Sequence, residues 1–168
     1  MRRSLLEKQR SICLDIGCGT AKKKGFVGLD CRPLPGVDIV CDLDEEPIPL
    51  EDNCVSKVWM SHFIEHVSPK RFLWVMGEIH RVCKSGATVA IHAPYGVNSY
   101  FVQDPTHQKP INEHTFEYFD PRYPMYMIYQ PPPFHIEKCV FDPNICIKIT
   151  LKVVKQNQNQ DVLLNPTI

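Results

Sequence analysis

The 168-residue sequence has no excess of charge of either sign, since 19 Lys and Arg residues balance 19 Asp and Glu residues. Binding to nucleic acid irrespective of its base sequence needs excess basic charge to meet the phosphates, so we expect no nucleic-acid partner. No apolar run approaches the roughly 20 residues that span a bilayer, and residues 1–11 lack the apolar stretch of a secretory signal. These absences predict a cytoplasmic protein without a membrane partner.

The eight cysteines include no C-x-x-C pair, a spacing typical of zinc and redox sites. In a cytoplasmic protein they are expected to be reduced thiols rather than a disulfide framework. Most of them are expected to be small residues of the core. We therefore expect no metal site.

Short apolar runs that end in turns predict the buried strands of a parallel sheet. Five such runs occupy residues 11–16, 26–30, 37–43, 55–61 and 87–92. One helix is expected between the last two runs, with Ser68 as its cap, Pro69 in its first turn and an apolar stripe from Phe72 to Val82. Strands that alternate with crossovers indicate an α/β fold.

The second half of the chain departs from this pattern. Residues 95–133 are rich in Pro, aromatic and His residues, which predicts an insertion that forms a binding loop or lid, with one short helix over residues 112–118. Residues 134–140 and 145–154 alternate like two strands of a hairpin. We therefore expect one domain over residues 1–154 and a flexible tail over residues 155–168.

A glycine turn and two carboxylates follow the first three predicted strands, at the edge where open α/β sheets bind ligands. The turn Gly17-Cys18-Gly19 lets a ligand approach the backbone closely. Asp30 is suited to accept hydrogen bonds from a ribose diol, and Asp42 from an adenine amino group, while the Leu43 amide donates to the ring. Each feature alone is often only a turn residue. Together and in this order, they indicate a cofactor.

These residues resemble the motifs of the class I S-adenosylmethionine-dependent methyltransferases, and in particular the small type 11 members. The similar segments are Leu14–Thr20, Val27–Asp30, Cys41–Leu43, Trp59–Val67 and Gly86–Ile91. The resemblance implies a single-domain, Rossmann-like sheet of seven strands, mostly parallel, that ends in an antiparallel hairpin. It also implies S-adenosylmethionine as cofactor, S-adenosylhomocysteine as product, and methyl transfer to an acceptor.

The resemblance further implies a role for each matching residue. Asp15 would orient the turn and help to hold the methionine ammonium group. The turn residues Gly17, Cys18 and Gly19 would let the cofactor lie against the backbone. The ribose would be bound by Asp30 and the adenine by Asp42 with Leu43, while Ser61 and His62 would lie beside the reactive methyl group.

The link between the first two strands departs from the family pattern. Residues 20–25 leave no room for the usual crossover helix, so we expect a shortened, irregular link. Without that helix the binding loop has less support. The alternative to an enzyme is therefore a degenerate methyltransferase-fold binding module, or a partner subunit, without turnover.

Three other functions fit the sequence less well. Lys22 stands where the third glycine of the dinucleotide motif G-x-G-x-x-G belongs. Residues 62–66 match the inverted zinc-protease motif H-x-x-E-H, but they lie at a predicted strand-to-helix junction, where a histidine with an ion pair is the simpler interpretation. Residues 61–63 also lack the Asn/Asp-Pro-Pro-Tyr/Phe turn of enzymes that methylate adenine in nucleic acids.

The insertion carries candidates for catalysis and acceptor binding. Small type 11 relatives have a segment similar to residues 104–107, which would face the cofactor. His107 and His62 are the candidate catalytic residues, because an imidazole suits a general base near neutral pH. Alternatively, residues 104–107 only hold the loop by local hydrogen bonds. The sequence favours a small-molecule acceptor, for which Tyr123, Tyr126 and Tyr129 would line a pocket or only pack the lid. The aromatic insertion also allows a homodimer or a partner protein.

Overall fold

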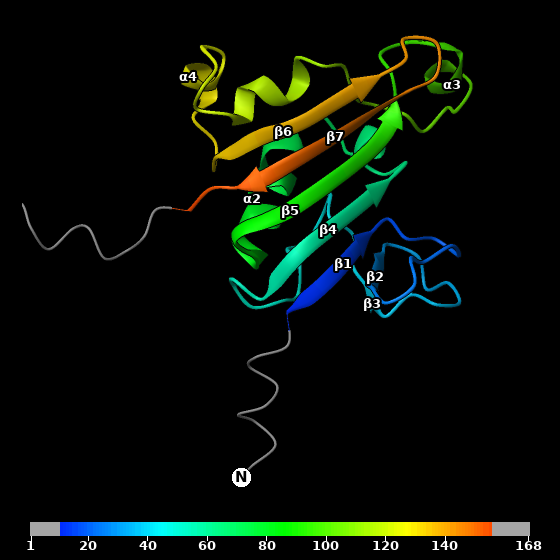
Figure 1. The fold of residues 1–168 in the computed structure, drawn as a ribbon. Helices are drawn as coiled ribbons and strands as arrows, with labels where there is room; N and C mark the ends of the chain where they lie inside the picture. Colours follow the sequence, from blue (N-terminus) through cyan, green and yellow to red (C-terminus); the bar gives the residue numbers. More distant parts are fainter. Residues whose placement is uncertain (1–10, 156–168) are drawn as a thin grey trace, which may run out of the picture.

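The computed structural model describes residues 11–155. Its centre is a seven-stranded sheet in the order β3-β2-β1-β4-β5-β7-β6 (Figure 1). The strands are β1 (Ile12–Ile16), β2 (Val27–Asp30), β3 (Ile39–Val40), β4 (Val55–Ser61), β5 (Cys83–Pro94), β6 (Phe134–Phe141) and β7 (Cys146–Val153). Strands β1 to β5 are mutually parallel, and β7 is antiparallel to β5 and β6. This confirms the predicted α/β sheet, whereas the predicted tail lies outside the described residues apart from Lys155.

Two predicted strands differ in length from the observed ones. Of residues 37–43, only Ile39 and Val40 pair with β2. At the preceding Asp38 the amide donates to the Gly28 carbonyl at 2.9 Å, and the carboxylate accepts hydrogen bonds from the Gly28 amide and the Lys22 ammonium group, both at 2.7 Å. Strand β5 begins earlier than predicted, at Cys83, directly after the helix.

Helix α2 (Phe72–Val82) packs against one face of the sheet through five buried apolar residues, Phe72, Val75, Met76, Ile79 and Val82. The predicted cap is wrong. The Ser68 hydroxyl donates to Asp44 Oδ1 at 3.2 Å, and the Ser68 carbonyl accepts from the amides of Arg71 and Phe72. Residues 68–71 therefore form a turn before the helix begins.

The insertion consists of short helical turns rather than one helix. They are α3 (Ser99–Val102), η2 (Thr115–Phe119) and α4 (Tyr126–Tyr129), while η1 (Ile64–His66) follows β4. The helix predicted over residues 112–118 is the 3₁₀ turn η2, which starts later because the Asn112 amide bonds to the Thr115 hydroxyl. Asp120, fully buried, accepts the Ile136 amide at 2.7 Å and so ties the insertion to β6.

Helical cover is confined to one face of the sheet. Phe72 of α2 lies 6.3 and 5.9 Å from the rings of Phe116 and Phe119, so η2 shares the α2 face. Figure 1 shows α2 behind the strands and their front face free of helices within residues 11–155. Several of the strand residues paired across that front face are polar, for example Lys57, Thr88 and Lys152, and Trp59 and Ala90 also pair there. Alternating apolar and polar faces are usual where one side of a sheet meets water.

The link between β1 and β2 contains no helix, which confirms the predicted short crossover. The buried carboxylate of Asp15 accepts the Lys23 amide at 2.7 Å. The Lys23 ammonium group lies 4.2 Å from the ring centre of Trp59 on β4. These two contacts hold the link against β1 and β4.

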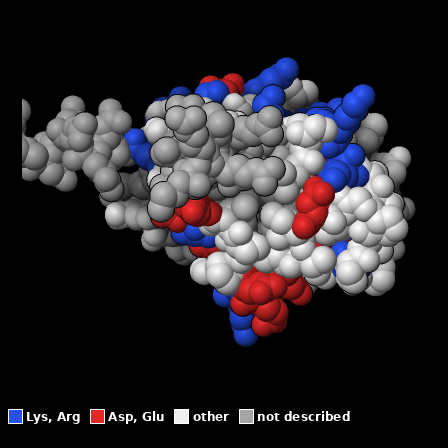
Figure 2. All heavy atoms as spheres, turned by 90° about the horizontal axis from the view of Figure 1, so that it is seen from below, with Lys and Arg blue, Asp and Glu red and all other residues white. Residues whose placement is uncertain are grey.

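The surface and the thiols agree with the composition. Seen from below, Lys and Arg lie mainly along one rim, and the largest group of Asp and Glu lies along the opposite rim (Figure 2). All eight cysteines are free, as predicted. Cys18, Cys41 and Cys83 are buried, and Cys31 is exposed. No helix among the described residues is long and apolar enough to cross a membrane.

Candidate functional site

A cavity of about 620 Å³, here called the strand-end cavity, opens at the carboxyl ends of β1 to β4. Five of the residues predicted to bind the cofactor or to act in catalysis line it, namely Gly17, Asp30, Asp42, Leu43 and His62. Arg32, Phe63, His66, Asp104 and Thr106 line it as well. The cavity therefore lies at the edge of the sheet where ligands of open α/β folds bind.

The glycine turn brings bare backbone to the wall of this cavity. Gly17 has a φ of +70°, and a Cβ atom there would lie 2.7 Å from the Phe63 side chain. The amides of Gly17 and Cys18 both donate to the Leu29 carbonyl, at 2.8 and 3.1 Å. Because a side chain at position 17 would collide with Phe63, the close approach requires glycine.

Asp30 is buried at the end of β2 and already carries several hydrogen bonds. Its Oδ2 accepts the Gly19 amide at 2.9 Å, and its Oδ1 accepts the Arg32 amide at 3.0 Å and Arg32 Nε at 3.1 Å. Burial opposes ionisation of this carboxyl, but the bonds from Arg32 and Gly19 outweigh it and hold the pKa of Asp30 below its usual value. A diol bound at Asp30 would therefore meet the exposed side chain of Arg32.

Asp15, Cys18, Gly19 and Ser61 do not line the cavity. Asp15 instead holds the crossover by accepting the Lys23 amide. Burial raises the pKa of Asp15, although this hydrogen bond acts to lower it. Gly19 contributes its amide to Asp30, while Cys18 packs its sulfur toward Gly28. Ser61 is the last residue of β4 and pairs with His92. These four residues therefore stand behind or beside the cavity wall.

Asp42 and Leu43 form the part of the wall that follows β3. The Asp42 carbonyl accepts the amides of Glu45 and Glu46, and its Oδ1 accepts the Asp44 amide at 3.0 Å. Leu43 is buried, whereas Asp42 is exposed. A carboxylate next to a buried apolar side chain suits a ligand with an amino group on a flat ring.

His62 joins the end of β4 to η1 through a left-handed residue with a φ of +53°. Its ring is 55% exposed, and Nδ1 lies 3.3 Å from Glu65 Oε1, a contact that raises the pKa of His62. Only residues 64–66 are helical here, so the motif H-x-x-E-H does not place His62 and His66 on one face of a helix. This geometry disfavours the zinc-protease interpretation.

His107 does not line the cavity, although its neighbours Asp104 and Thr106 do. Its Nδ1 lies 2.8 Å from the Phe101 carbonyl, and its Nε2 lies 3.9 Å from Glu65 Oε1. Asp104 and Thr106 make local hydrogen bonds, as in the alternative interpretation of this segment. No pattern in the sequence predicts that Glu65 is buried beside two histidines. Nor does any pattern predict that Arg32 contacts Asp30.

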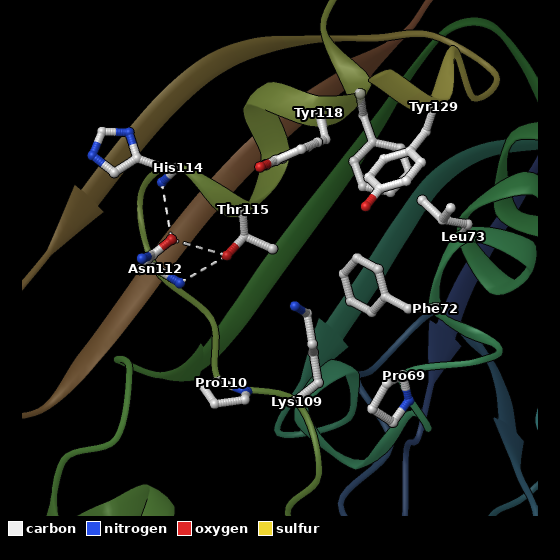
Figure 3. A pocket seen from close by; sticks show the side chains of 11 residues that line it. Pro69, Phe72, Leu73, Lys109, Pro110, Asn112, His114, Thr115, Tyr118 and Tyr129 are labelled. Carbon is white, nitrogen blue, oxygen red and sulfur yellow. Dashed lines mark hydrogen bonds between the residues drawn. The ribbon is translucent and has the colours of Figure 1, made fainter. Parts of the chain in front are cut away.

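A second cavity, of about 520 Å³, lies beside the amino end of α2. Phe72, Leu73 and Tyr129 surround its apolar side, and Lys109 reaches toward Phe72 (Figure 3). Of the three tyrosines singled out in the sequence, only Tyr129 lines it, with its ring 5.7 Å from that of Tyr118. It shares no lining residue with the strand-end cavity.

A model of the methyltransferase domain family matches residues 29–91, which include Asp30, Asp42, Leu43, Ser61 and His62. The chain is similar in structure to a SAM-dependent methyltransferase from Archaeoglobus fulgidus, with 21% identity, 90% of each chain covered and a TM-score of 0.62. It is also similar to the 1,6-didemethyltoxoflavin-N1-methyltransferase of Burkholderia thailandensis, solved with bound S-adenosylhomocysteine (10% identity, 90% of this chain and 74% of that chain, TM-score 0.61).

A third similar structure is a chain from the complex of a Haloferax volcanii methyltransferase activator with a methyltransferase. It shares 11% identity with this chain, with 94% of this chain and 90% of that chain covered and a TM-score of 0.62. No curated protein matches the sequence. The family model and the common fold confirm the resemblance to class I methyltransferases that the sequence predicts.

Proposed function

The chain has the fold of the class I S-adenosylmethionine-dependent methyltransferases, and we propose that it transfers a methyl group from S-adenosylmethionine to a small-molecule acceptor. The observation that carries this proposal is the convergence of Gly17, Asp30 and Asp42 on one cavity. These three residues follow three separate strands. The resemblance implies that each of them contacts a different part of one cofactor.

The residues around the strand-end cavity fit S-adenosylmethionine. Gly17 lines the cavity without a side chain, and its missing Cβ lets Phe63 pack closely against the turn beside the cavity. The buried, ionised carboxylate of Asp30 is suited to the ribose hydroxyls, and Asp42 with Leu43 to the adenine. When bound, S-adenosylmethionine would supply an electrophilic methyl group and leave as S-adenosylhomocysteine.

The acceptor would enter beside His62, because the acceptor atom must lie in line with the methyl group. His62 lines the cavity, and its Nδ1 faces Glu65. This leaves Nε2 as the nitrogen that can accept a proton from the acceptor. His107 has its ring only 6% exposed and stands behind the wall. We infer that His62 is the better candidate for an acceptor contact and that His107 acts by positioning other residues.

The alternative is a methyltransferase-fold binding module or partner subunit that has lost turnover. Two observations favour it: no helix follows the glycine turn, and the Arg32 side chain occupies Oδ1 of Asp30. The similar Haloferax volcanii methyltransferase was solved with an activator protein, so completion of the site by a partner is a related possibility. Methyl transfer to any acceptor by the isolated chain would remove this alternative.

Calorimetric titration with S-adenosylmethionine and S-adenosylhomocysteine tests the proposal. Asp30→Ala should weaken binding by about 1.5–3 kcal/mol, the value of a hydrogen bond to a charged group. This corresponds to roughly 10- to 150-fold in Kd. Asp52→Ala is the matched control, because Asp52 is an exposed carboxylate paired with Arg81 outside the cavity.

Equal binding by the parent and Asp30→Ala would refute the ribose assignment. Binding of neither ligand to the parent would favour the module without turnover. Binding that is lost in Asp30→Ala and kept in Asp52→Ala justifies the next step, a screen of small-molecule acceptors read out by S-adenosylhomocysteine formation.

A further inference from the structure

Three side chains with metal-binding atoms converge at the wall of the strand-end cavity, which His66 lines. One ligand atom from each of Glu65, His66 and His107 lies within 4.8 Å of the other two. The two rings are 4.6 Å apart and nearly perpendicular. The backbone fixes the cluster, because the Glu65 carbonyl accepts the amides of Gln108 and Lys109 at 2.8 and 3.0 Å.

The Glu65 carboxylate is the first sign of a ligand. It is fully buried, and within residues 11–155 neither of its oxygens accepts a hydrogen bond. His62 Nδ1 lies 3.3 Å from Oε1, at ion-pair distance but without hydrogen-bond geometry, and Oε2 has no hydrogen-bond partner among the described residues. Buried carboxylates are normally hydrogen-bonded, paired or bound to a cation, because an isolated buried charge is costly. Glu65 therefore points to a cation between it and the two rings.

The second sign is the way the two imidazoles are held. His107 Nδ1 must donate to the Phe101 carbonyl at 2.8 Å, since a carbonyl can only accept. The Thr106 hydroxyl gives its one hydrogen to Asp104 Oδ1 at 2.7 Å, so it accepts from His66 Nδ1 at 3.0 Å. Both rings are thus left with Nε2 lone pairs. Histidine ligands of metals are typically fixed in this way, with the second nitrogen donating to an oxygen.

The distances suit a small ion after a slight contraction. His107 Nε2 is 3.9 Å from Glu65 Oε1 and 3.8 Å from Asp104 Oδ2. Bonds of 2.0–2.1 Å in a tetrahedral site put neighbouring ligand atoms about 3.3 Å apart. The pair His107 and Glu65 would therefore move together by about half an ångström, and the other pairs of the cluster, which lie within 4.8 Å, by at most about 1.5 Å. Asp104 Oδ2 approaches His107 Nε2 but does not belong to the three-residue cluster, so the fourth position of a tetrahedral site would fall to a water molecule.

We propose that Glu65, His66 and His107, with a water molecule in the fourth position, bind a divalent transition-metal ion of the Zn²⁺ type. Two imidazoles with carboxylates suit such ions, whereas Mg²⁺ and Ca²⁺ prefer oxygen ligands throughout. The proposed site differs from the expectation from the sequence that no metal is bound. It uses Glu65 and His66 of the motif H-x-x-E-H, but His107 of the insertion takes the place of His62.

The ion would clamp the insertion to the core. Glu65 and His66 belong to η1 beside β4, whereas His107 belongs to the insertion. Metal binding should therefore raise the unfolding temperature, because only the folded chain brings these ligands together. The proposal does not rest on the proposed methyl transfer, since the ion can be titrated without S-adenosylmethionine.

The experiment uses the full chain, stripped with EDTA and titrated with Zn²⁺ by calorimetry and with Co²⁺ by visible absorption. We expect one ion per chain and Co²⁺ bands of nitrogen and oxygen ligands. His107→Gln and Glu65→Gln should weaken binding at least tenfold. His135→Gln is the matched control, because it removes an imidazole on β6 outside the cluster and should bind like the parent.

A further variant at an exposed residue avoids the risk that substitution of a buried residue unfolds the protein. Thr106 is exposed, and Thr106→Val removes the oxygen that orients His66 while keeping the side-chain volume. It should weaken binding by about 10- to 100-fold, as loss of such an outer partner does. The proposal is overturned if the parent binds no Zn²⁺, if the variants bind as tightly as the parent, if Mg²⁺ binds equally well, or if Co²⁺ gives thiolate charge-transfer bands.

Discussion

Replacement of Gly17 by alanine tests the geometry on which the cavity depends. Gly17 has a φ of +70°, and an added Cβ would lie 2.7 Å from two atoms of Phe63. The left-handed backbone costs a residue with a Cβ about 1–2 kcal/mol. Forcing a methyl group into a packed contact typically costs another 1–3 kcal/mol or so. Gly17→Ala should therefore lower the free energy of unfolding by about 2–5 kcal/mol.

Gly86→Ala separates the two contributions. Gly86 has a φ of +75°, close to that of Gly17, but a Cβ there meets nothing within 4 Å. It should cost only the backbone contribution of about 1–2 kcal/mol. Urea unfolding of the parent and both variants gives the difference between them, since their slopes should agree. If Gly17→Ala costs no more than Gly86→Ala, the close approach to Phe63 is not a constraint, and the argument for bare backbone at the cavity wall fails.

Three further predictions concern buried carboxylates. Asp120→Asn should lower the free energy of unfolding by about 1.5–3 kcal/mol in urea, because the carboxylate joins the insertion to β6 through charged hydrogen bonds; an unchanged midpoint would contradict this. Hydrogen bonds hold the pKa values of Asp30, Glu78 and Asp120 below those of the same groups in the unfolded chain. The melting temperature should therefore be highest above about pH 4 and fall as the pH drops below that value. A melting temperature that stays constant down to about pH 3 would exclude this. Arg32→Ala should tighten S-adenosylmethionine binding by up to about fivefold, because a largely exposed ion pair is worth at most about 1 kcal/mol; weaker binding would mean that Arg32 helps to hold the cofactor.

The sequence predicts the sheet well because its strands are short apolar runs with clear ends. Strand β4 occupies the predicted residues 55–61, and the terminal hairpin lies where the alternation placed it. The edge strand β3 is shorter than its apolar run, and the Asp38 carboxylate before it bonds to Gly28 and Lys22. Such side-chain contacts between distant residues have no periodicity that the sequence could reveal.

The site is only partly predictable for the same reason. Gly17, Asp30 and Asp42 each follow a predicted strand, so the order of the strands is enough to place them at one edge of the sheet. Short turns such as η2 and α4 fall below the length at which apolar spacing is informative. The approach of His107 to Glu65 depends on how the insertion folds back, so the H-x-x-E-H motif alone could not show that His107 lies beside Glu65 and His66.

The glycine turn itself distinguishes the kinds of cofactor that this edge can hold. A dinucleotide needs free backbone amides, and usually a helix amino end, to meet its pyrophosphate. Here the amides of Gly17 and Cys18 are both used by the Leu29 carbonyl, and that of Gly19 by Asp30. No helix follows the turn, because the Lys23 amide is held by Asp15 and the chain passes directly into β2.

These bonds have a second consequence for the choice between an enzyme and a module without turnover. The loop that a crossover helix would support is held instead by Leu29, Asp30 and Asp15, all at the ends of β1 and β2. The lack of the helix therefore does not by itself remove the site. A turn whose amides already have hydrogen-bond partners suits a ligand that has no phosphate groups. S-adenosylmethionine is such a ligand, and its ribose and adenine could be bound at the neighbouring strand ends.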